Sequence, residues 1–320
     1  MSKILCIGEL LIDFICADID SSLINGTSFI KKAGGAPANV TAAISKLGGS
    51  AAFGGSVGDD AFGVFLKNTL DDVGVDTSLM KLLTKENTTL AFVSLKNNGE
   101  RDFIFNRGAD VNYNLNEEEL ETLKDYKIVH FGSATALLGG KLKETYLKAI
   151  IKAKELDLFI SFDPNYRSDL WKNRVEEFVE ISKECIKFAD FIKVSDEEAK
   201  LLTGKEDLEA AARELLKFGT KTVAITLGKE GTLVADKCNL EVVPSIKIYS
   251  VDSTGAGDAF VGATLYKLVQ EEDSKVVMSS FDKFKEIIQF GNIVGAIVCT
   301  KLGAIAALPD LEEVMNFIKK

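Results

Sequence analysis

Short apolar runs alternate with longer amphipathic segments along most of the chain. The runs at residues 4–7, 128–131 and 158–162 have the length and apolar content of buried strands, whereas residues 37–47 and 141–154 place apolar side chains at helical spacing. Strands that alternate with helices of this length predict a mainly parallel central sheet with helices on both faces. By the same pattern we expect further strands at residues 51–56, 191–194, 223–227 and 232–235, and further helices at residues 60–70, 257–268, 284–300 and 311–319.

One part of the chain breaks this alternation. Residues 88–95 and 101–107 have the pattern of strands, and the Asn-Gly pair between them is typical of a hairpin turn. A second pair of strands is expected at residues 10–17 and 28–32. Antiparallel pairs are therefore inserted into a parallel framework.

We expect the two pairs to form a small sheet that projects as a lid, made of approximately residues 10–34 and 88–112. A sheet of this size cannot cover its own apolar face, so it needs a ligand or a partner. An ordinary extension of the main sheet is the alternative. With this lid, the whole chain, residues 1–320, is predicted to be a single domain.

The charge balance narrows the classes of partner. The chain has 38 Lys and Arg against 48 Asp and Glu residues, a net charge of −10, and its basic residues form no run. Such a chain lacks the clustered positive charge that a nucleic acid or an anionic membrane attracts. A small anion such as ATP is still compatible, since backbone amides at a helix end attract it locally.

The cysteines and the hydropathy pattern indicate a reducing compartment. None of the five cysteines forms a C-x-x-C pair, which gives no support to a zinc or disulfide framework, and we expect all five to lie in the core. The N-terminal apolar run is too short for a signal peptide, and residues 293–308 are too short and too interrupted to span a bilayer. The expected location is the cytoplasm.

The richest local chemistry is in the segment Gly255-Ala256-Gly257-Asp258. Its small residues let the backbone turn tightly and present amide groups, and the helix expected here adds the positive end of its dipole. Such amides suit the charge on a transferring phosphoryl group, and Asp258 is placed to take the proton of an attacking hydroxyl. The alternative is structural: the glycines make a turn and Asp258 stabilises the helix start.

The sequence lacks the residues that several other catalytic or nucleotide-binding mechanisms require. A single histidine, His130, argues against a Ser-His-Asp triad. No Gly-Lys pair has the glycine that a Walker A loop requires, and no G-x-G-x-x-G follows an expected strand. A general base would then be a carboxylate.

Three motifs occur in a characteristic order: KAGGAPANV at residues 32–40, GSVGDDAFG at residues 55–63 and DSTGAGD at residues 252–258. In these motifs the chain resembles the ribokinase-like (PfkB) family of carbohydrate kinases, and within it the bacterial fructokinases, over residues 4–308. The resemblance implies a three-layer α/β/α ribokinase-like fold with a small β-sheet lid. It also implies ATP-dependent phosphorylation of a sugar with Mg²⁺.

The resemblance also implies roles for individual positions. Asp258 would be the catalytic base, with Gly255, Ala256 and Gly257 as the anion hole. The residues that would contact the sugar are Asp13, Gly34, Gly35, Asn39, Phe103, Arg107 and Arg167. Those that would contact the nucleotide are Lys193, Ser195, Thr226, Gly228, Gly231 and Asn292.

The sequence of the predicted lid supports part of this assignment. Arg101, Phe103, Phe105 and Arg107 alternate along one strand, so they share one face. Two arginines beside two aromatic rings suit a pocket with apolar walls and polar contacts to hydroxyl groups. The alternative is that the rings pack on the main domain and the arginines are rim charges.

The resemblance implies two ions. Glu198 would organise the water shell of Mg²⁺, and Asp252 and Thr254, with carbonyl groups of residues 299–303, would hold K⁺. The family's N-x-x-E motif here has Ser195 in place of asparagine, which leaves the contribution of that position open. The alternative for Glu198 and its acidic neighbours is a first helical turn stabilised by the dipole.

Together these observations predict an enzyme that transfers the γ-phosphoryl group of ATP to a primary hydroxyl of fructose, giving fructose 6-phosphate. 2-Keto-3-deoxygluconate is an alternative acceptor, since Arg101, Arg107 and Arg167 are available for its carboxylate; a nucleoside or aminoimidazole riboside is another. A nucleotide or sugar sensor without turnover is the alternative of a different class. The exposed edges of the lid also favour a homodimer.

Overall fold

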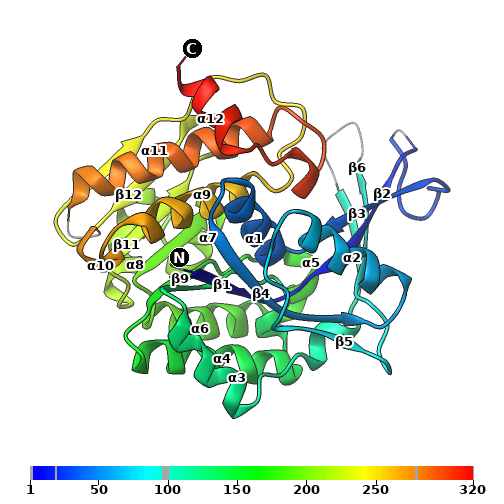
Figure 1. Ribbon diagram of the computed structural model, residues 1–320. Helices are drawn as coiled ribbons and strands as arrows, with labels where there is room; N and C mark the ends of the chain where they lie inside the picture. The colour runs from blue at the N-terminus through cyan, green and yellow to red at the C-terminus, as the bar shows by residue number, and fades with distance from the viewer. Residues whose placement is uncertain (1–2, 19, 96–100, 278–279, 320) are drawn as a thin grey trace.

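The computed structural model describes residues 3–18, 20–95, 101–277 and 280–319. Within these residues the strands form two sheets, one of nine strands and one of four. Figure 1 shows the larger sheet in the middle of the molecule between two layers of helices, with the smaller sheet at one side. The predicted three-layer α/β/α arrangement is therefore confirmed.

The central sheet is parallel except at one edge. β12 pairs antiparallel with β11 and β13 antiparallel with β12, whereas the other neighbouring strands run in parallel. In spatial order the strands are β13 (Leu240–Val243), β12 (Thr232–Ala235), β11 (Thr222–Thr226), β10 (Phe191–Ser195), β9 (Phe159–Phe162), β8 (Ile128–Phe131), β1 (Lys3–Ile7), β4 (Ser50–Gly58) and β5 (Met80–Leu83).

The central strands supply apolar side chains to both faces of the sheet. In β1, Ile4 and Cys6 pack into one core and Leu5 and Ile7 into the other, and all four are fully buried. The helices on the first face are α1 (Ala36–Lys46), α9 (Ala256–Gln270) and α11 (Phe281–Val298). Those on the second face are α4 (Gly140–Glu155), α6 (Val175–Ile186), α7 (Asp196–Thr203) and α8 (Leu208–Lys217). The remaining helices are α2 (Ala61–Asp72), α3 (Glu117–Glu121), α5 (Ser168–Trp171), α10 (Ser274–Val277) and α12 (Leu311–Ile318).

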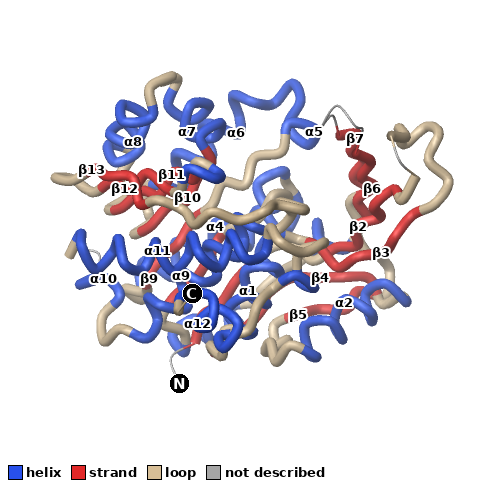
Figure 2. The backbone as a smooth tube through the Cα atoms, turned by 90° about the horizontal axis from the view of Figure 1, so that it is seen from above, coloured by secondary structure: helices blue, strands red, loops and turns tan. Residues whose placement is uncertain are grey.

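The smaller sheet, which we call the lid sheet, combines the two predicted strand pairs. Its strands in spatial order are β3 (Phe29–Gly34), β2 (Leu11–Cys16), β6 (Leu90–Leu95) and β7 (Arg101–Asn106). β2 runs antiparallel to β3 and parallel to β6, and β7 runs antiparallel to β6. Figure 2 shows this sheet at the side of the molecule with α5 next to β7. The predicted hairpin turn at residues 96–100 lies outside the described residues, and the single-domain assignment stays a prediction.

Some elements of the fold are missing from the sequence-based prediction. β5 and β13 are short strands at the two edges of the central sheet, where pairing with a neighbour decides the conformation. α6 buries Phe178, Ser182 and Cys185 at helical spacing, so its signal is present in the sequence although our prediction omits it.

The prediction that all five cysteines lie in the core is wrong for Cys238. Cys6 and Cys185 are buried, but Cys238 is exposed in the turn between β12 and β13. The amides of Cys238 and Asn239 donate to Oδ1 of Asp236 over 2.8 and 2.6 Å, so the turn itself fixes the exposed position. Among the described residues, no helix is long and apolar enough to cross a membrane.

Candidate active site

The first turn of α9 carries the segment Gly255-Ala256-Gly257-Asp258. Gly255 has a φ of 78° directly before the helix, and a Cβ atom there would lie 2.8 Å from the Cβ atom of Ala304. Only glycine accepts this conformation and this contact at little cost. The predicted turn is present, and α9 begins one residue earlier than expected, at Ala256.

The backbone amides of this turn differ in their availability. The amide of Ala256 donates to the carbonyl oxygen of Ser253 over 3.2 Å. In the part of the chain that the structure describes, the amides of Gly255 and Gly257 donate to no protein acceptor. The first amides of a helix lack partners within the helix and lie at the positive end of its dipole. Two of the three amides predicted for the anion hole are thus available to an anion.

Asp258 faces α1 from the first turn of α9. Its Oδ2 accepts a hydrogen bond from Nδ2 of the buried Asn39 over 2.8 Å. The two helices pack closely because Gly262 has no side chain: a Cβ atom there would lie 2.6 Å from the Cβ atom of Ala43. Oδ1 of Asn39 is buried and has no hydrogen-bond partner among the described residues. α1 therefore orients the carboxylate that is predicted to be the base.

The surroundings of Asp258 raise its affinity for a proton above that of an ordinary aspartate. Burial raises the pKa of Asp258. The hydrogen bond from Asn39 and the positive charges of Lys193 and Arg167 lower this pKa, but the net change is upward. A carboxylate with a raised pKa holds a proton more strongly, which suits a base that must accept one from an alcohol.

A buried lysine lies behind the turn. Lys193 of β10 donates to Oδ2 of Asp163 over 2.9 Å, and the two side chains are 11% and 3% exposed. Nζ of Lys193 also lies 3.3 Å from the place that a Cβ atom of Gly257 would take. Burial lowers the pKa of Lys193, but the negative charges of Asp163, Glu198 and Asp258 outweigh it, so the lysine stays positive. The ammonium group therefore adds positive charge beside the available amides.

On the lid side, Asp13 of β2 lies against Gly34 of β3. A Cβ atom on Gly34 would overlap Oδ2 of Asp13, so any side chain at this position would displace the carboxylate of Asp13. Gly35 follows with a φ of 109°, and a Cβ atom there would overlap the carbonyl oxygen of Glu9. The glycine pair lets β3 and the start of α1 approach β2, which brings Asp13 into electrostatic range of Asp258.

Asp13, Asp258 and Arg167 influence one another. The pKa of Asp13 is raised to about 7, chiefly by burial; the charge of Arg167 opposes this shift, and the charges of Glu9 and Asp258 add to it. Arg167 lowers the pKa of Asp258 as well. Its exposed guanidinium donates to the carbonyl oxygen of Tyr166 over 2.9 Å. The structure thus brings these three predicted residues together from three separate parts of the chain.

The register of the lid sheet decides which of its side chains share a face. Asp13 pairs with Ala91 and Ala91 with Phe105, so Asp13 and Phe105 lie on the same side of the sheet. Phe103 and Arg107, two residues on either side of Phe105, share that side. The rings of Phe103 and Phe105 stack, with their centroids 4.8 Å apart.

A hollow of about 430 Å³ opens beside this face. Its walls include Phe103 and Phe105 of β7, Arg107 directly after this strand, and Lys172, which follows α5. The hollow therefore has an apolar wall of two rings. The charged residues that line it are the cations Arg107, Lys172 and Arg174 and one carboxylate, Asp169, so its rim is mainly cationic. The side chain of Arg101, also predicted to face this side, lies outside the described residues.

On the side predicted for the nucleotide, Ser195 and Glu198 form the N-terminal capping box of α7. Oγ of Ser195 accepts from the amide of Glu198 over 3.1 Å, and Oε2 of Glu198 accepts from the amide of Ser195 over 2.7 Å. Oε1 of Glu198 accepts from the amide of Tyr166 over 2.6 Å. Both carboxylate oxygens of Glu198 thus accept hydrogen bonds from backbone amides. This agrees with the structural alternative, in which the acidic residues stabilise the first turn of the helix. Thr226, which pairs with Ser195 across β10 and β11, donates to the carbonyl oxygen of Val194 over 3.3 Å.

The remaining predicted nucleotide contacts lie around the turn between β11 and β12. Gly228 and Gly231 have φ values of 56° and 111°, and a Cβ atom on Gly231 would overlap the carbonyl oxygen of Val243. Nδ2 of Asn292 donates to the same carbonyl oxygen over 3.0 Å, and Oδ1 of Asn292 accepts from Thr232 over 2.6 Å. The amide of Asn292 therefore fastens β12 and β13 to α11.

Asp252 and Thr254 join the turn before α9 to the loop after α11. Oδ1 of Asp252 accepts from the amide and the hydroxyl of Thr254 over 3.0 and 2.7 Å, and Oδ2 accepts from the amide of Gly303 over 3.0 Å. The amide of Asp252 donates to the carbonyl oxygen of Cys299 over 3.2 Å. The residues predicted for K⁺ thus lie together. No group of three or more acidic, cysteine or histidine side chains that could hold a metal ion occurs in the described ranges.

Comparisons with known proteins agree on one family. The model of the pfkB family carbohydrate kinase matches residues 1–311. The chain is also 40% identical to probable fructokinase-4 of Arabidopsis thaliana, over 99% of this chain and 97% of that protein. The chain belongs to the pfkB family of carbohydrate kinases.

Solved structures share the fold of this carbohydrate kinase. Fructokinase with bound ATP from Xylella fastidiosa has a TM-score of 0.88 and 30% identity, over 99% of this chain and 98% of that one. A double-mutant fructokinase from Vibrio cholerae O395, in a fructose-, ADP- and potassium-bound form, has a TM-score of 0.86 and 30% identity, over 99% and 98%. The predicted family, ribokinase-like fold and enzyme class are confirmed, and we set the sensor alternative aside.

The structure of the kinase also shows buried polar residues that our prediction missed. Glu9 and Asp110 are 1% and 0% exposed, and both contact the hydroxyl of Thr135. No local pattern reveals this group, because its members lie far apart in the sequence. The buried position of a carboxylate becomes visible only when the lid sheet and the central sheet are assembled.

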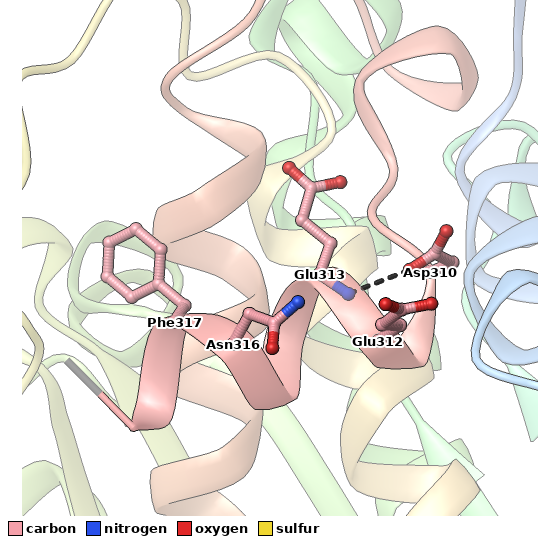
Figure 3. A pocket seen from close by; sticks show the side chains of 5 residues that line it. All are labelled: Asp310, Glu312, Glu313, Asn316 and Phe317. Atoms are coloured by element: carbon pink, nitrogen blue, oxygen red, sulfur yellow. Dashed lines mark hydrogen bonds between the residues drawn. The ribbon is translucent and has the colours of Figure 1, made fainter.

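A second hollow of the kinase lies on the surface of α12. Figure 3 shows the side chains that line it: Asp310, Glu312, Glu313, Asn316 and Phe317. Asp310 caps the helix, since its Oδ1 accepts from the amide of Glu313 over 2.8 Å. None of these residues is a predicted site residue, so the hollow contributes nothing to the site.

Proposed function

We propose that this kinase is a fructokinase, which transfers the γ-phosphoryl group of ATP to a primary hydroxyl of fructose and gives fructose 6-phosphate and ADP. The three proteins compared above carry that name, and one of the two solved structures contains fructose and ADP. The observation that carries the proposal is the grouping of Asp258, which has a raised pKa, with the available amides of Gly255 and Gly257. Asp13 of the lid sheet completes this group.

Asp258 is proposed to act as the base. Its carboxylate takes the proton of the sugar hydroxyl while the hydroxyl oxygen attacks the γ-phosphorus in line, and the bond from that phosphorus to the bridging oxygen of ADP breaks. The amides of Gly255 and Gly257 donate to the phosphoryl oxygens, where charge accumulates. The amide of Ala256 joins them when its hydrogen bond to Ser253 opens.

The nucleotide is proposed to lie between this turn and the carboxyl ends of β10 and β11. Lys193, beside Gly257, offsets the negative charge of the phosphates. Gly228 and Gly231 let the backbone come close to the nucleotide. The contributions proposed for Ser195, Thr226 and Asn292 come from the shape of the pocket, because these side chains already bond within the protein.

The sugar is proposed to lie between α1, α9 and the lid sheet. The carboxylate of Asp13 accepts hydrogen bonds from two sugar hydroxyls. The buried Oδ1 of Asn39, which has no partner among the described residues, accepts another. Gly34 and Gly35 leave room for these contacts. The remaining contacts are proposed for Phe103, Arg107 and Arg167.

Two ions complete the proposal. When bound, Mg²⁺ would neutralise and orient the triphosphate. Both carboxylate oxygens of Glu198 accept hydrogen bonds from backbone amides. This residue therefore fits a role in ordering the water shell of Mg²⁺ better than direct ligation of the ion. Asp252 and Thr254 offer oxygen donors that fit K⁺ together with carbonyl groups of residues 299–303, and one related structure contains potassium.

An acceptor panel tests the proposed substrate. ADP release from ATP and Mg²⁺ is followed with fructose, other ketohexoses, 2-keto-3-deoxygluconate, nucleosides and aminoimidazole riboside. We expect the highest kcat/KM for fructose, and a phosphorus NMR spectrum of the product that places the phosphate on O6. The Asp258→Asn variant measures the background ATP hydrolysis. A higher kcat/KM for any other acceptor would contradict the proposal.

2-Keto-3-deoxygluconate stays the second candidate because of the cationic rim of the hollow. Arg107 and Lys172 line it, and a sugar carboxylate needs converging cations. However, Arg107 is already paired with Asp110 over 2.7 Å, so less of its charge is available to an anionic sugar. This pairing favours a neutral sugar such as fructose.

Association into a homodimer through the lid sheet is also proposed. β3 and β7 form the two edges of this sheet, and Ile104 of β7 is 51% exposed on the face opposite Phe103 and Phe105. Sedimentation analysis should give a dimer for the unmodified chain and a monomer for the Ile104→Lys variant. A monomer at all concentrations of the unmodified chain would contradict this expectation.

A further inference from the structure

The lid sheet is joined to the central sheet at two crossings that share one anchor. At the first crossing, Glu9 lies between β1 and β2. At the second, Asp110 follows β7, on the short helical turn Ala109–Asn112. Both side chains contact residues of the loop 133–135, which follows β8. One loop of the central sheet therefore holds both ends of the lid sheet.

Glu9 fastens the first crossing. Its Oε1 accepts from the amides of Ala36 and Ala134 over 3.2 and 3.3 Å, and its Oε2 accepts from the hydroxyl of Ser133. Ala36 is the first residue of α1, the helix that carries Asn39. The carboxylate of Glu9 thus ties the loop 133–135 to the start of this helix.

Asp110 fastens the second crossing and holds Arg107. Its Oδ1 accepts from the hydroxyl of Thr89 over 2.5 Å. Its Oδ2 accepts from the hydroxyl of Thr135 over 2.9 Å and from Nε and Nη2 of Arg107 over 3.0 and 2.7 Å. Nη1 of Arg107 donates to no protein acceptor in the described residues, and the side chain of Arg107, 19% exposed, lines the hollow beside the lid sheet.

In the described residues, the group around Thr135 contains two buried carboxylates, Glu9 and Asp110, and one cation, Arg107. Glu9 and Asp110 are two buried carboxylates, and the hydroxyl of Thr135, which lies 3.4 Å from Glu9 and 2.9 Å from Asp110, has one proton to donate. In the described part of the chain, Arg107 is the cation in contact with this pair of carboxylates, and it contacts Asp110. A buried carboxylate without a cation is costly, so Arg107 is strongly held where it is.

We propose that Asp110 is a positioning residue that orients the guanidinium of Arg107 toward the acceptor sugar, and that Thr135 fixes Asp110 for this purpose. The inference rests on the proposed function in one respect, namely that the sugar binds at the Arg107 face of the lid sheet. Two of the three nitrogens of the guanidinium are committed to Asp110, and the third is left for the substrate. Arg107 therefore presents a fixed donor rather than a mobile charge.

Kinetics of three variants test this role. Asp110→Asn keeps the shape and removes the charge, and Thr135→Val removes the hydroxyl. Both variants should raise the KM for the sugar, by about 10- to 100-fold for Asp110→Asn, which is the scale of a hydrogen bond to a charged group. Because the ATP side is separate, kcat and the KM for ATP should change by less than this. Thr135→Ser restores the hydroxyl and should restore the KM for the sugar.

The matched control is Thr145→Val. Thr145 is as buried as Thr135, at 2% against 0% exposure, and its hydroxyl donates to the carbonyl oxygen of Tyr113 over 3.4 Å rather than to a carboxylate. We expect the KM for the sugar to stay at the unmodified value in this variant. If Asp110→Asn does not fold, the KM values for the sugar in Thr135→Val and Thr135→Ser test the proposal by themselves.

Two results would overturn the proposal. One is an unchanged KM for the sugar in folded Asp110→Asn and Thr135→Val. The other is an equal loss in all kinetic constants that follows the fall in melting temperature and occurs in Thr145→Val too, since that is the effect of a structural residue. The series uses the best acceptor of the panel, so a failure of fructose removes the proposed substrate and leaves the role of Asp110 measurable.

Discussion

The phosphoryl side of the active site and the sugar side are held by different kinds of contact. On the proposed phosphoryl side, seven consecutive residues from Asp252 to Asp258 carry the turn, the available amides and the residue proposed as the base. On the sugar side, Asp13, Phe103 and Arg107 are placed by strand register and by hydrogen bonds between distant residues. The first side depends on the backbone conformation of one short segment, whereas the second depends on side chains that residues from several parts of the chain hold in place.

The comparison predicts the largest effect for the base. Asp258→Asn should lower kcat by about 10²- to 10⁴-fold, because the amide cannot accept the hydroxyl proton. Binding of ATP, measured by calorimetry, should change little. Asp207→Asn, which alters an aspartate that caps α8 away from the site, is the control. Near-normal turnover in Asp258→Asn would remove this residue from the mechanism.

Two glycine substitutions separate the two sides. Gly34→Ala places a Cβ atom on Oδ2 of Asp13, so kcat/KM for the sugar should fall by about 10²-fold, mainly through KM. Gly257→Ala places a Cβ atom 3.3 Å from Nζ of Lys193, a flexible group that can shift, so kcat should fall by about tenfold and the KM for the sugar should hold. If both variants changed the same constant, the two sides would not be independent.

The affinity for the sugar should rise with pH. The pKa of Asp13 is raised to about 7, chiefly by burial, so at lower pH the carboxyl is protonated and is a weaker acceptor of sugar hydroxyls. The affinity for fructose without nucleotide should increase by up to about tenfold per pH unit below this pKa and level off above it. Calorimetric titrations on both sides of the pKa measure this, and Asp13→Asn should abolish the dependence.

The same group should affect stability in the opposite direction. The folded chain holds the proton of Asp13 more strongly than the unfolded chain, where the pKa has its ordinary value of 3.8. The free energy of unfolding of the ligand-free protein should therefore fall as pH rises from about 4 toward 7. Thermal melts of the unmodified chain and of Asp13→Asn isolate this contribution, and parallel curves for the two proteins would contradict it.

The smallest expected effect concerns K⁺. The proposed ion lies beside the anion hole and adds positive potential without touching the sugar, so replacing it with a larger organic cation at equal ionic strength should lower kcat several-fold. The KM for the sugar should not change. Thr254→Val, which removes one hydroxyl from the proposed site, should weaken the response to K⁺. Equal activity in both salts would argue against the site.

Sequence-based prediction is more accurate for the phosphoryl side than for the sugar side, because the first is formed by one short segment and the second by contacts between distant segments. The Gly-Ala-Gly-Asp turn is local, so its conformation and the start of α9 follow from the side chains of the segment itself. The alternation of Phe103, Phe105 and Arg107 predicted their shared face correctly, since a strand has a period of two. That Asp13 lies on the same face depends on the pairing of β2 with β6, which no local pattern contains.

Other features were out of reach because they depend on tertiary contacts. The side chain of Asn292 bonds to Thr232 and Val243, which lie 60 and 49 positions earlier in the chain, although Asn292 matches a contact position of the family. The anchor formed by Glu9, Asp110 and Thr135 joins residues more than 100 positions apart, for example Glu9 and Thr135 with a separation of 126. Such groups become visible only in the folded chain.

The raised pKa of Asp13 has a consequence for the heat of substrate binding. Near neutral pH, part of the ligand-free enzyme carries a proton on Asp13, and hydrogen bonds from a bound sugar favour the ionised form. Binding must then release protons to the solution, and the buffer takes them up. With the sugar bound at Asp13 as proposed, the measured enthalpy of association will depend on the ionisation enthalpy of the buffer, and binding of an uncharged sugar will acidify an unbuffered solution.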